Sequence, residues 1–123
     1  MKLYTIQMGK WRLAEKLGVE VFNITVKNGN RHFAPTWKLL KSYKESPRGE
    51  DDIVAYKKEY RKLMNISVRR FTEEWEELCS RDILVIGCYC PDGDFCHRYE
   101  LVKYLEIFAK YKNIPFEYAG ELK

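Results

Sequence analysis

The sequence predicts a small α/β domain in which a mostly parallel sheet lies between two layers of helices. Apolar segments typical of strands alternate along the chain with segments of 3.6-residue periodicity. Residues 83–88 form an uncharged run, as expected of a strand covered by helices on both faces. The sequence shows no internal repeat, low-complexity tract or linker. Residues 1–123 are therefore expected to form one three-layer αβα domain.

The first part of the chain predicts a strand, a short helix and a second strand. Residues 2–7 alternate polar and apolar side chains, which is typical of a strand. Residues 10–18 carry apolar side chains at helical spacing, and Gly18 is a suitable helix stop. Residues 19–26 are rich in β-branched and apolar side chains, so a second strand is expected. This order is typical of a parallel crossover.

Three helices are predicted in the middle of the chain. Thr36 can cap the first and Ser67 the third, and Asp51 and Asp52 open the second. The first helix is expected over residues 36–45 and the third over residues 68–79, with the longest between them.

The last part of the chain predicts two strands with a helix between them. A buried strand is expected over residues 82–90, and a helix over residues 98–113. Asn113 can end this helix, since asparagine tolerates the left-handed backbone that follows many helices. Residues 116–122 then form the last strand.

Positive charge is concentrated in the first half of the chain. The formal net charge is +4, and residues 1–50 carry ten Lys or Arg against four Asp or Glu. Such a basic excess suits an anionic partner, namely a nucleotide, a phosphate or a nucleic acid. An ordinary solvated surface explains the same excess equally well.

The sequence predicts a cytoplasmic protein with no membrane contact, located in the host cytoplasm if a phage encodes it. No apolar run approaches the roughly 20 residues that a membrane-spanning helix needs. The N-terminal segment lacks the long apolar core of a secretory signal. The four cysteines are therefore expected to be reduced thiols.

The stretch CYCPDGDFCHRYE, residues 88–100, concentrates the chemistry at the end of the buried strand and the start of a helix. Cys96 is the candidate nucleophile, because a helix N-terminus and a neighbouring Arg98 or protonated His97 lower the pKa of a thiol. His97 is the candidate acid or base. Arg98 and the free amides of the first helical turn can hold an anion.

Six further residues are predicted as ligand contacts: Cys90, Lys27, Arg31, His32, Tyr4 and Trp37. The three basic residues follow the second strand, and the carboxyl ends of neighbouring parallel strands meet at one edge of a sheet. The two aromatic side chains can stack on a base. The expected ligand is an anionic, nucleotide-like or phosphate-bearing small molecule, and catalysis and simple binding both stay open.

Two other functions remain open. A nucleic-acid binding module is favoured by residues 56–62 and 67–71, which interleave basic and aromatic side chains. A solvated helix face with internal ion pairs explains the same pattern. A zinc- or redox-dependent interaction protein is the other alternative, and a Cys90–Cys96 disulfide would be its redox switch.

The cysteine spacing does not lead us to assign a metal. Cys88, Cys90, Cys96 and His97 offer sulfur and imidazole ligands that suit zinc. Structural zinc sites usually take their ligands from two segments well apart in sequence, whereas these four lie in one short segment. No cofactor is assigned either, and the oligomeric state stays open.

The segment LVIGCYCPDGDFCHRYELVKYL resembles the signature of the domain-of-unknown-function 488 family. In that family a buried strand ends in Cys, an acidic and proline-containing loop follows, and Cys-His-Arg opens a helix. LYTIQ resembles the opening strand of the family, and NITVKNGNRHFAPTW resembles a subgroup often found in phages and bacteria. The resemblance implies an α/β fold and a site built from Cys88, Cys96, His97 and Arg98. It implies no settled reaction; by analogy of fold, the enzyme class to consider is a nucleotide-processing hydrolase or a glycosidase-like enzyme.

The chain departs from the family pattern at two places. Many members have Asp-x-Arg at the end of the second strand, where this chain has Asn23, Ile24 and Thr25. Lys27, Arg31 and His32 are the candidates to replace the basic group. Many members also have Glu where Cys90 stands, which weakens a four-ligand metal site as a shared feature of the family.

Overall fold

The chain folds around a four-stranded, all-parallel sheet in a computed structural model that describes residues 1–90 and 94–123. The strand order is β2-β3-β1-β4, so the first strand lies between the two last ones in the sequence. The strands are β1 (Lys2–Gln7), β2 (Val21–Asn23), β3 (Ile83–Cys88) and β4 (Glu117–Leu122). The predicted α/β class is confirmed, and the sheet is fully parallel in the described chain.

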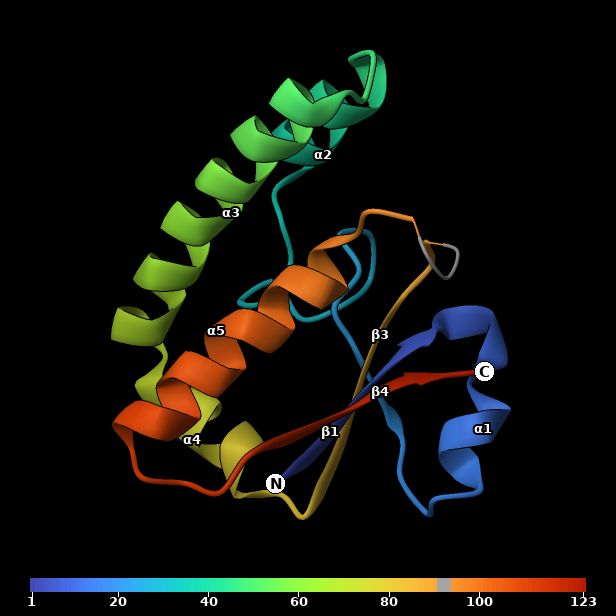
Figure 1. The fold of residues 1–123 in the computed structure, drawn as a ribbon, viewed down its shortest axis with the longest axis vertical. Coiled ribbons are helices and arrows are strands. Elements are labelled where there is room, and N and C mark those ends of the chain that lie inside the picture. The colour runs from blue at the N-terminus through green and yellow to red at the C-terminus, as the bar shows by residue number, and fades with distance from the viewer. Residues whose placement is uncertain (91–93) are drawn as a thin grey trace.

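Helices cover the two faces of the sheet unequally (Figure 1). The elements α3, α4 and α5 lie over one face, and the short α1 lies over the other, so the three layers are of very different thickness. The helices are η1 (Met8–Lys10, a 3₁₀ turn), α1 (Arg12–Glu15), α2 (Trp37–Glu45), α3 (Glu50–Arg70), α4 (Thr72–Ser80) and α5 (His97–Tyr111).

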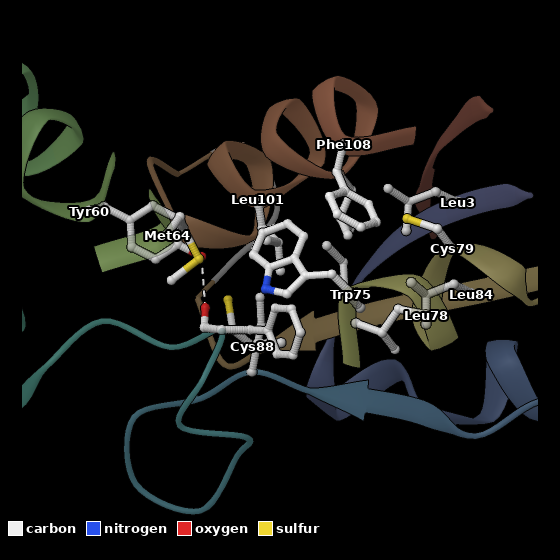
Figure 2. Close-up of a cluster of buried hydrophobic side chains, with 14 of the residues drawn as sticks. Leu3, Tyr60, Met64, Trp75, Leu78, Cys79, Leu84, Cys88, Leu101 and Phe108 are labelled. Carbon is white, nitrogen blue, oxygen red and sulfur yellow. Dashed lines mark hydrogen bonds between the residues drawn. The ribbon is translucent and has the colours of Figure 1, made fainter. Parts of the chain in front are cut away.

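Each face of the sheet has its own apolar core, because alternate strand residues point to opposite faces. Trp75 lies in the middle of the larger core, between Leu101 of α5 and side chains of β3 such as Leu84 (Figure 2). The smaller core lies under α1 and contains Ile6 and Val85. The larger core therefore carries most of the apolar burial.

The strand β2 is shorter than the predicted strand over residues 19–26. The Asn23 side chain accepts a hydrogen bond from the Thr25 backbone N–H at 2.9 Å, and the Thr25 hydroxyl donates to Asn28 Oδ1 at 2.7 Å. Such side-chain bonds compete with the sheet ladder and turn the chain. The strand therefore ends at Asn23. The loop that begins there carries Lys27, Arg31 and His32 and is called here the basic loop.

The predicted helix cap at Ser67 is wrong. The helix α3 continues through this residue, and the break comes at Phe71, whose φ and ψ of −127° and 39° are not helical. The Ser67 hydroxyl instead donates to the His32 carbonyl at 2.6 Å and accepts from the Trp75 indole N–H at 2.9 Å. This side chain therefore connects two helices to the basic loop.

Other predicted helix ends are confirmed. The Thr36 hydroxyl accepts from the Leu39 N–H at 3.1 Å at the start of α2, as an N-cap does. The Asp52 carboxylate accepts from the Gly49 N–H at 3.0 Å at the start of α3. Asn113 has a φ of 57°, in the left-handed region, just after α5.

Replacing Gly87 by Ala is expected to lower the free energy of unfolding by about 1–3 kcal/mol, because the site has no room for a methyl group. A Cβ atom on Gly87 would lie 2.6 Å from Val21 Cγ1 and 2.9 Å from both Ile6 Cγ2 and Met8 Sδ. Urea denaturation of the two proteins measures the difference. Gly9→Ala is the control, since a Cβ there meets nothing within 4 Å. An equal effect of both substitutions would contradict this account.

Candidate functional site

The start of α5 and the end of β3 meet at the carboxyl edge of the sheet, where parallel sheets usually bind ligands. Cys96 is the N-cap of α5, with extended φ and ψ of −154° and 146°, and His97 is the first helical residue. Cys88 is the last residue of β3. Part of the acidic and proline-containing loop of the signature, residues 91–93, lies outside the described residues.

Arg98 is fully buried, and its guanidinium is already satisfied. Nε and NH2 donate to the two Glu121 carboxylate oxygens at 3.3 and 2.7 Å. NH1 donates to Cys88 Sγ at 3.0 Å and to the Cys90 carbonyl at 2.9 Å, and NH2 also donates to the Tyr99 hydroxyl at 2.8 Å. All five N–H donors of a guanidinium therefore have partners inside the protein.

The expectation that Arg98 holds an anionic ligand does not fit this arrangement. A carboxylate from β4 already neutralises the guanidinium, and no donor is left for a phosphate. Arg98 instead ties the end of β3 and the start of α5 to β4. Its role is to position the residues around it.

The ion pair keeps Glu121 ionised. Burial alone raises the pKa of this carboxyl, but hydrogen bonds from Arg98, Thr5 and Tyr99 and the charge of the guanidinium lower it more strongly. The pKa of Glu121 is therefore below its ordinary value. The pair contributes stability wherever Glu121 is charged in the folded protein.

His97 is a buried, neutral imidazole. Its Nε2 lies 2.6 Å from the Ile24 carbonyl oxygen, which can only accept a hydrogen bond, so Nε2 carries the proton. Burial lowers the pKa of His97 to about 4; the Ile24 hydrogen bond opposes this and the Arg98 charge adds to it. His97 is therefore not the protonated neighbour that the sequence suggested for Cys96. Its unprotonated Nδ1 lies 3.8 Å from Cys96 Sγ.

Cys96 has Cys88 as its sulfur neighbour, and not Cys90 as the predicted disulfide required. The two sulfur atoms are in direct contact, and the Cα atoms are 8.0 Å apart. Disulfides usually join Cα atoms about 4.4–6.8 Å apart, and a wider pair needs backbone movement to form the bond. We therefore describe Cys88 and Cys96 as two thiol groups that converge on one point.

A cavity of about 630 Å³ opens above these groups and is called here the thiol cavity. Cys90, Cys96 and His97 line one part of it. The remaining wall comes from the α2–α3 segment and the loop before α5: Leu40, Tyr43, Lys44, Arg48, Ile53, Tyr56, Tyr89, Asp94 and Phe95. The thiol cavity therefore joins sulfur and imidazole groups to aromatic rings and two cations.

Four predicted ligand contacts gather in a different cavity. This cavity of about 650 Å³ is called here the basic cavity, and it is lined by Lys27, Arg31, His32, Trp37 and Arg70 among others. The His32 Nδ1 atom lies 2.7 Å from a Glu74 carboxylate oxygen, and its ring stacks on Phe71 with centroids 3.4 Å apart. These four side chains thus line a different cavity from the one that Cys96 and His97 line.

Tyr4 lies in neither cavity. It sits on β1 and packs against the smaller core, with Lys2 Nζ 5.8 Å from the ring centroid. Its neighbour Thr5 points to the other face of the sheet, where its hydroxyl lies 2.6 Å from the Tyr118 hydroxyl. Base stacking on Tyr4 therefore has no support in the geometry.

Sequence reasoning missed Lys44, Arg48 and Glu121. In the sequence, Lys44 belongs to a predicted solvated helix and Arg48 to the break after it. They lie at the thiol cavity only because α2 and α3 fold over the site. Glu121 reads as one acidic residue in a final strand. No local pattern marks its partner, which lies 23 residues earlier in the chain.

Replacing Glu121 by Gln is expected to lower the free energy of unfolding at pH 7 by about 3–5 kcal/mol, since it leaves a buried guanidinium without its counter-charge. Because the folded-state pKa of Glu121 is lowered, its stabilising effect is complete above the ordinary carboxyl pKa and is lost as the pH falls through the lowered value. Urea denaturation of the wild-type protein and the variant, at several values from pH 3 to pH 7, measures the loss and its pH dependence. This range extends below and above the ordinary carboxyl pKa.

Glu77→Gln is the matched control. Glu77 also binds an arginine through both carboxylate oxygens, at 2.6 and 2.7 Å from Arg81, but this pair is exposed. The expected loss is therefore below about 1 kcal/mol. Equal losses in the two variants, or a difference that grows in acid, would contradict the role given to Glu121.

Comparison with known proteins gives one match. Residues 18–107 match the family model DUF488-N3a, described as the active DUF488-N3 subclade, and this covers more than half of the chain. No curated protein and no solved structure matches the chain. None of the helices in the described part of the chain is long and apolar enough to cross a membrane. The family match confirms the resemblance found in the sequence: the chain belongs to the DUF488 family, in the subclade described as active DUF488-N3.

Proposed function

We propose that the protein binds a nucleotide-like, phosphate-bearing small molecule in the thiol cavity. The observation that carries this proposal is the composition of the cavity, which combines an aromatic wall, two cations and a floor of thiol and imidazole groups. Its volume of about 630 Å³ falls within the range typical of small-molecule sites. Its position at the carboxyl edge of a parallel sheet is where such ligands usually bind.

The aromatic wall suits a flat ring. Tyr43 and Phe95 have centroids 5.4 Å apart, and Tyr56 lies edge-on to Phe95 at 5.1 Å. The contacts fix these rings against one another, so they present a preformed surface. Tyr89 is 57% exposed at the same cavity and adds a solvent-facing ring. A heteroaromatic base would gain stacking contacts on the half-buried Tyr43 and Phe95, whereas Tyr56 is buried and only supports Phe95.

Lys44 and Arg48 supply the positive charge that Arg98 cannot. Both side chains are exposed and line the thiol cavity, whereas Asp94 brings one negative charge. Burial raises the pKa of the Cys90 thiol, and the charges of Arg98 and then Lys44 oppose this rise, so the Lys44 charge acts on at least one thiol of the cavity. A phosphate held by these cations would place the rest of the ligand over Cys96 and His97.

The groups predicted to be catalytic lie at the floor of this cavity. Cys96 and His97 are nearly fully buried but line it, so a bound ligand can reach them without passing through the core. The family model describes its subclade as active, which supports a reaction on the ligand rather than storage of it. We propose that this reaction takes place at Cys96 and His97, in a reducing, cytoplasmic environment that keeps the sulfurs available.

The basic cavity is the second candidate site for an anion. Trp37 is 60% exposed there, beside Lys27, Arg31 and Arg70. In contrast, the basic and aromatic pattern of α3 does not support nucleic-acid binding by stacking, because Tyr56 and Tyr60 are only 3% and 0% exposed. The pattern is that of an amphipathic helix with its tyrosines in the core.

Two double variants with the same change of charge decide between the cavities. Lys44→Gln with Arg48→Gln is expected to weaken binding of nucleoside mono- and diphosphates roughly 10- to 100-fold, the effect of losing one charge-assisted hydrogen bond worth about 1.5–3 kcal/mol. Lys27→Gln with Arg31→Gln lowers the net charge equally and is expected to leave the affinity within about twofold. Isothermal titration of both variants and the wild-type protein, at one salt concentration, measures these affinities.

Further ligands make this test specific. A nucleoside without phosphate should bind more weakly than its monophosphate and should lose little affinity in the Lys44 and Arg48 variant. Absence of nucleotide binding by the wild-type protein would reject the proposal. A loss confined to the Lys27 and Arg31 variant would move the site to the basic cavity.

A further inference from the structure

Three side chains with metal-ligating atoms converge below the thiol cavity. Cys88, Cys96 and His97 are each no more than 5% exposed, and their ligating atoms all lie within 4.8 Å of one another. They come from the end of β3 and the start of α5. We propose that Cys88 Sγ, Cys96 Sγ and His97 Nδ1 bind one thiophilic metal ion, of the class of Zn²⁺. The argument needs no ligand in the thiol cavity, although it uses Cys96 and His97, the residues at which the proposed function places its reaction.

The spacing suits a shared ion. A tetrahedral zinc ion with a bond of about 2.3 Å to sulfur and about 2.0 Å to nitrogen holds the two atoms roughly 3.5 Å apart. Cys96 Sγ and His97 Nδ1 are 3.8 Å apart. The two sulfurs touch, so an ion would separate them by side-chain rotation. The Cα separation of 8.0 Å leaves room for that rotation.

The imidazole presents the correct nitrogen. Metal-binding histidines usually donate the N–H of the second ring nitrogen to a carbonyl or a carboxylate, which fixes the tautomer. His97 Nε2 donates to the Ile24 carbonyl at 2.6 Å, so the lone pair is on Nδ1, the atom beside Cys96. The ring is therefore held in the form and orientation that a metal ligand needs.

The Cys88 sulfur also has an outer partner. Arg98 NH1 donates a hydrogen bond to Cys88 Sγ at 3.0 Å. Glu121 and the Cys90 carbonyl hold the guanidinium in place. Two of the three proposed ligands thus have a fixed hydrogen-bond partner behind them, as expected of a built metal site.

The fourth coordination direction faces the thiol cavity, because Cys96 and His97 both line it. A site with three protein ligands and one open position is typical of catalytic zinc, whereas structural zinc is usually enclosed by four protein ligands. On binding Zn²⁺, the two thiols each release a proton to solvent, and the neutral imidazole releases none. The ion would enter from the cavity, and the open position would face a bound ligand.

Metal titration of the reduced, chelator-treated chain tests the proposal. One Zn²⁺ per chain is expected, and Co²⁺ as a probe should give thiolate-to-metal charge-transfer absorption and tetrahedral d–d bands. Cys88→Ser, Cys96→Ser and His97→Asn should each weaken Zn²⁺ binding by more than the roughly 10- to 100-fold that loss of an outer partner costs. Cys79→Ser is the matched control, because Cys79 is a buried thiol at the other end of the core, on α4, and should leave binding unchanged.

A measurement on the wild-type protein covers the case in which a variant fails to fold. Zn²⁺ should slow alkylation of Cys88 and Cys96, mapped by mass spectrometry, and leave the rate at Cys79 unchanged. Lack of stoichiometric Zn²⁺ binding by the reduced protein would overturn the proposal, as would wild-type affinity in Cys88→Ser or Cys96→Ser. Neither assay contains a nucleotide, so failure of the proposed function would leave these results intact.

Discussion

The buried ion pair of Arg98 and Glu121 is the constraint on which the candidate site depends. Burying a guanidinium is costly unless its charge is paired and every N–H donor is satisfied. Arg98 meets both conditions with groups from β3, α5 and β4. These groups are far apart in sequence, so the pair holds the carboxyl edge of the sheet in one arrangement. Arg98 therefore acts on the site through the residues that it fixes.

The same arrangement explains why the thiols and the imidazole have defined positions. Cys88 is held from behind by Arg98, and His97 by the carbonyl of Ile24. Cys96 lies between them because it is the N-cap of α5. The end of β3 thus contributes one of these groups and the start of α5 contributes the other two. Half of the residues that line the cavity above them come from the α2–α3 segment, so the candidate site joins two different parts of the chain.

The order of strands and helices follows from the sequence because apolar periodicity is a local property. The partners of buried polar groups are not local, and here the predictions fail. Ser67 is a residue type that often caps helices, yet its hydroxyl forms hydrogen bonds with the His32 carbonyl and the Trp75 indole. The strand expected over residues 82–90 ends at Cys88, so Cys90 lies beyond it. Arg98 looks like a ligand-binding group until Glu121 is placed beside it.

The strand order has a consequence for synthesis of the protein. The central strand β1 is made first, but both of its neighbours, β3 and β4, are made last. A growing chain must carry β1 with two open edges, and with Leu3 and Ile6 uncovered, until nearly the whole sheet has left the ribosome. Nascent chains of this topology are therefore natural clients for chaperones that shield extended apolar segments.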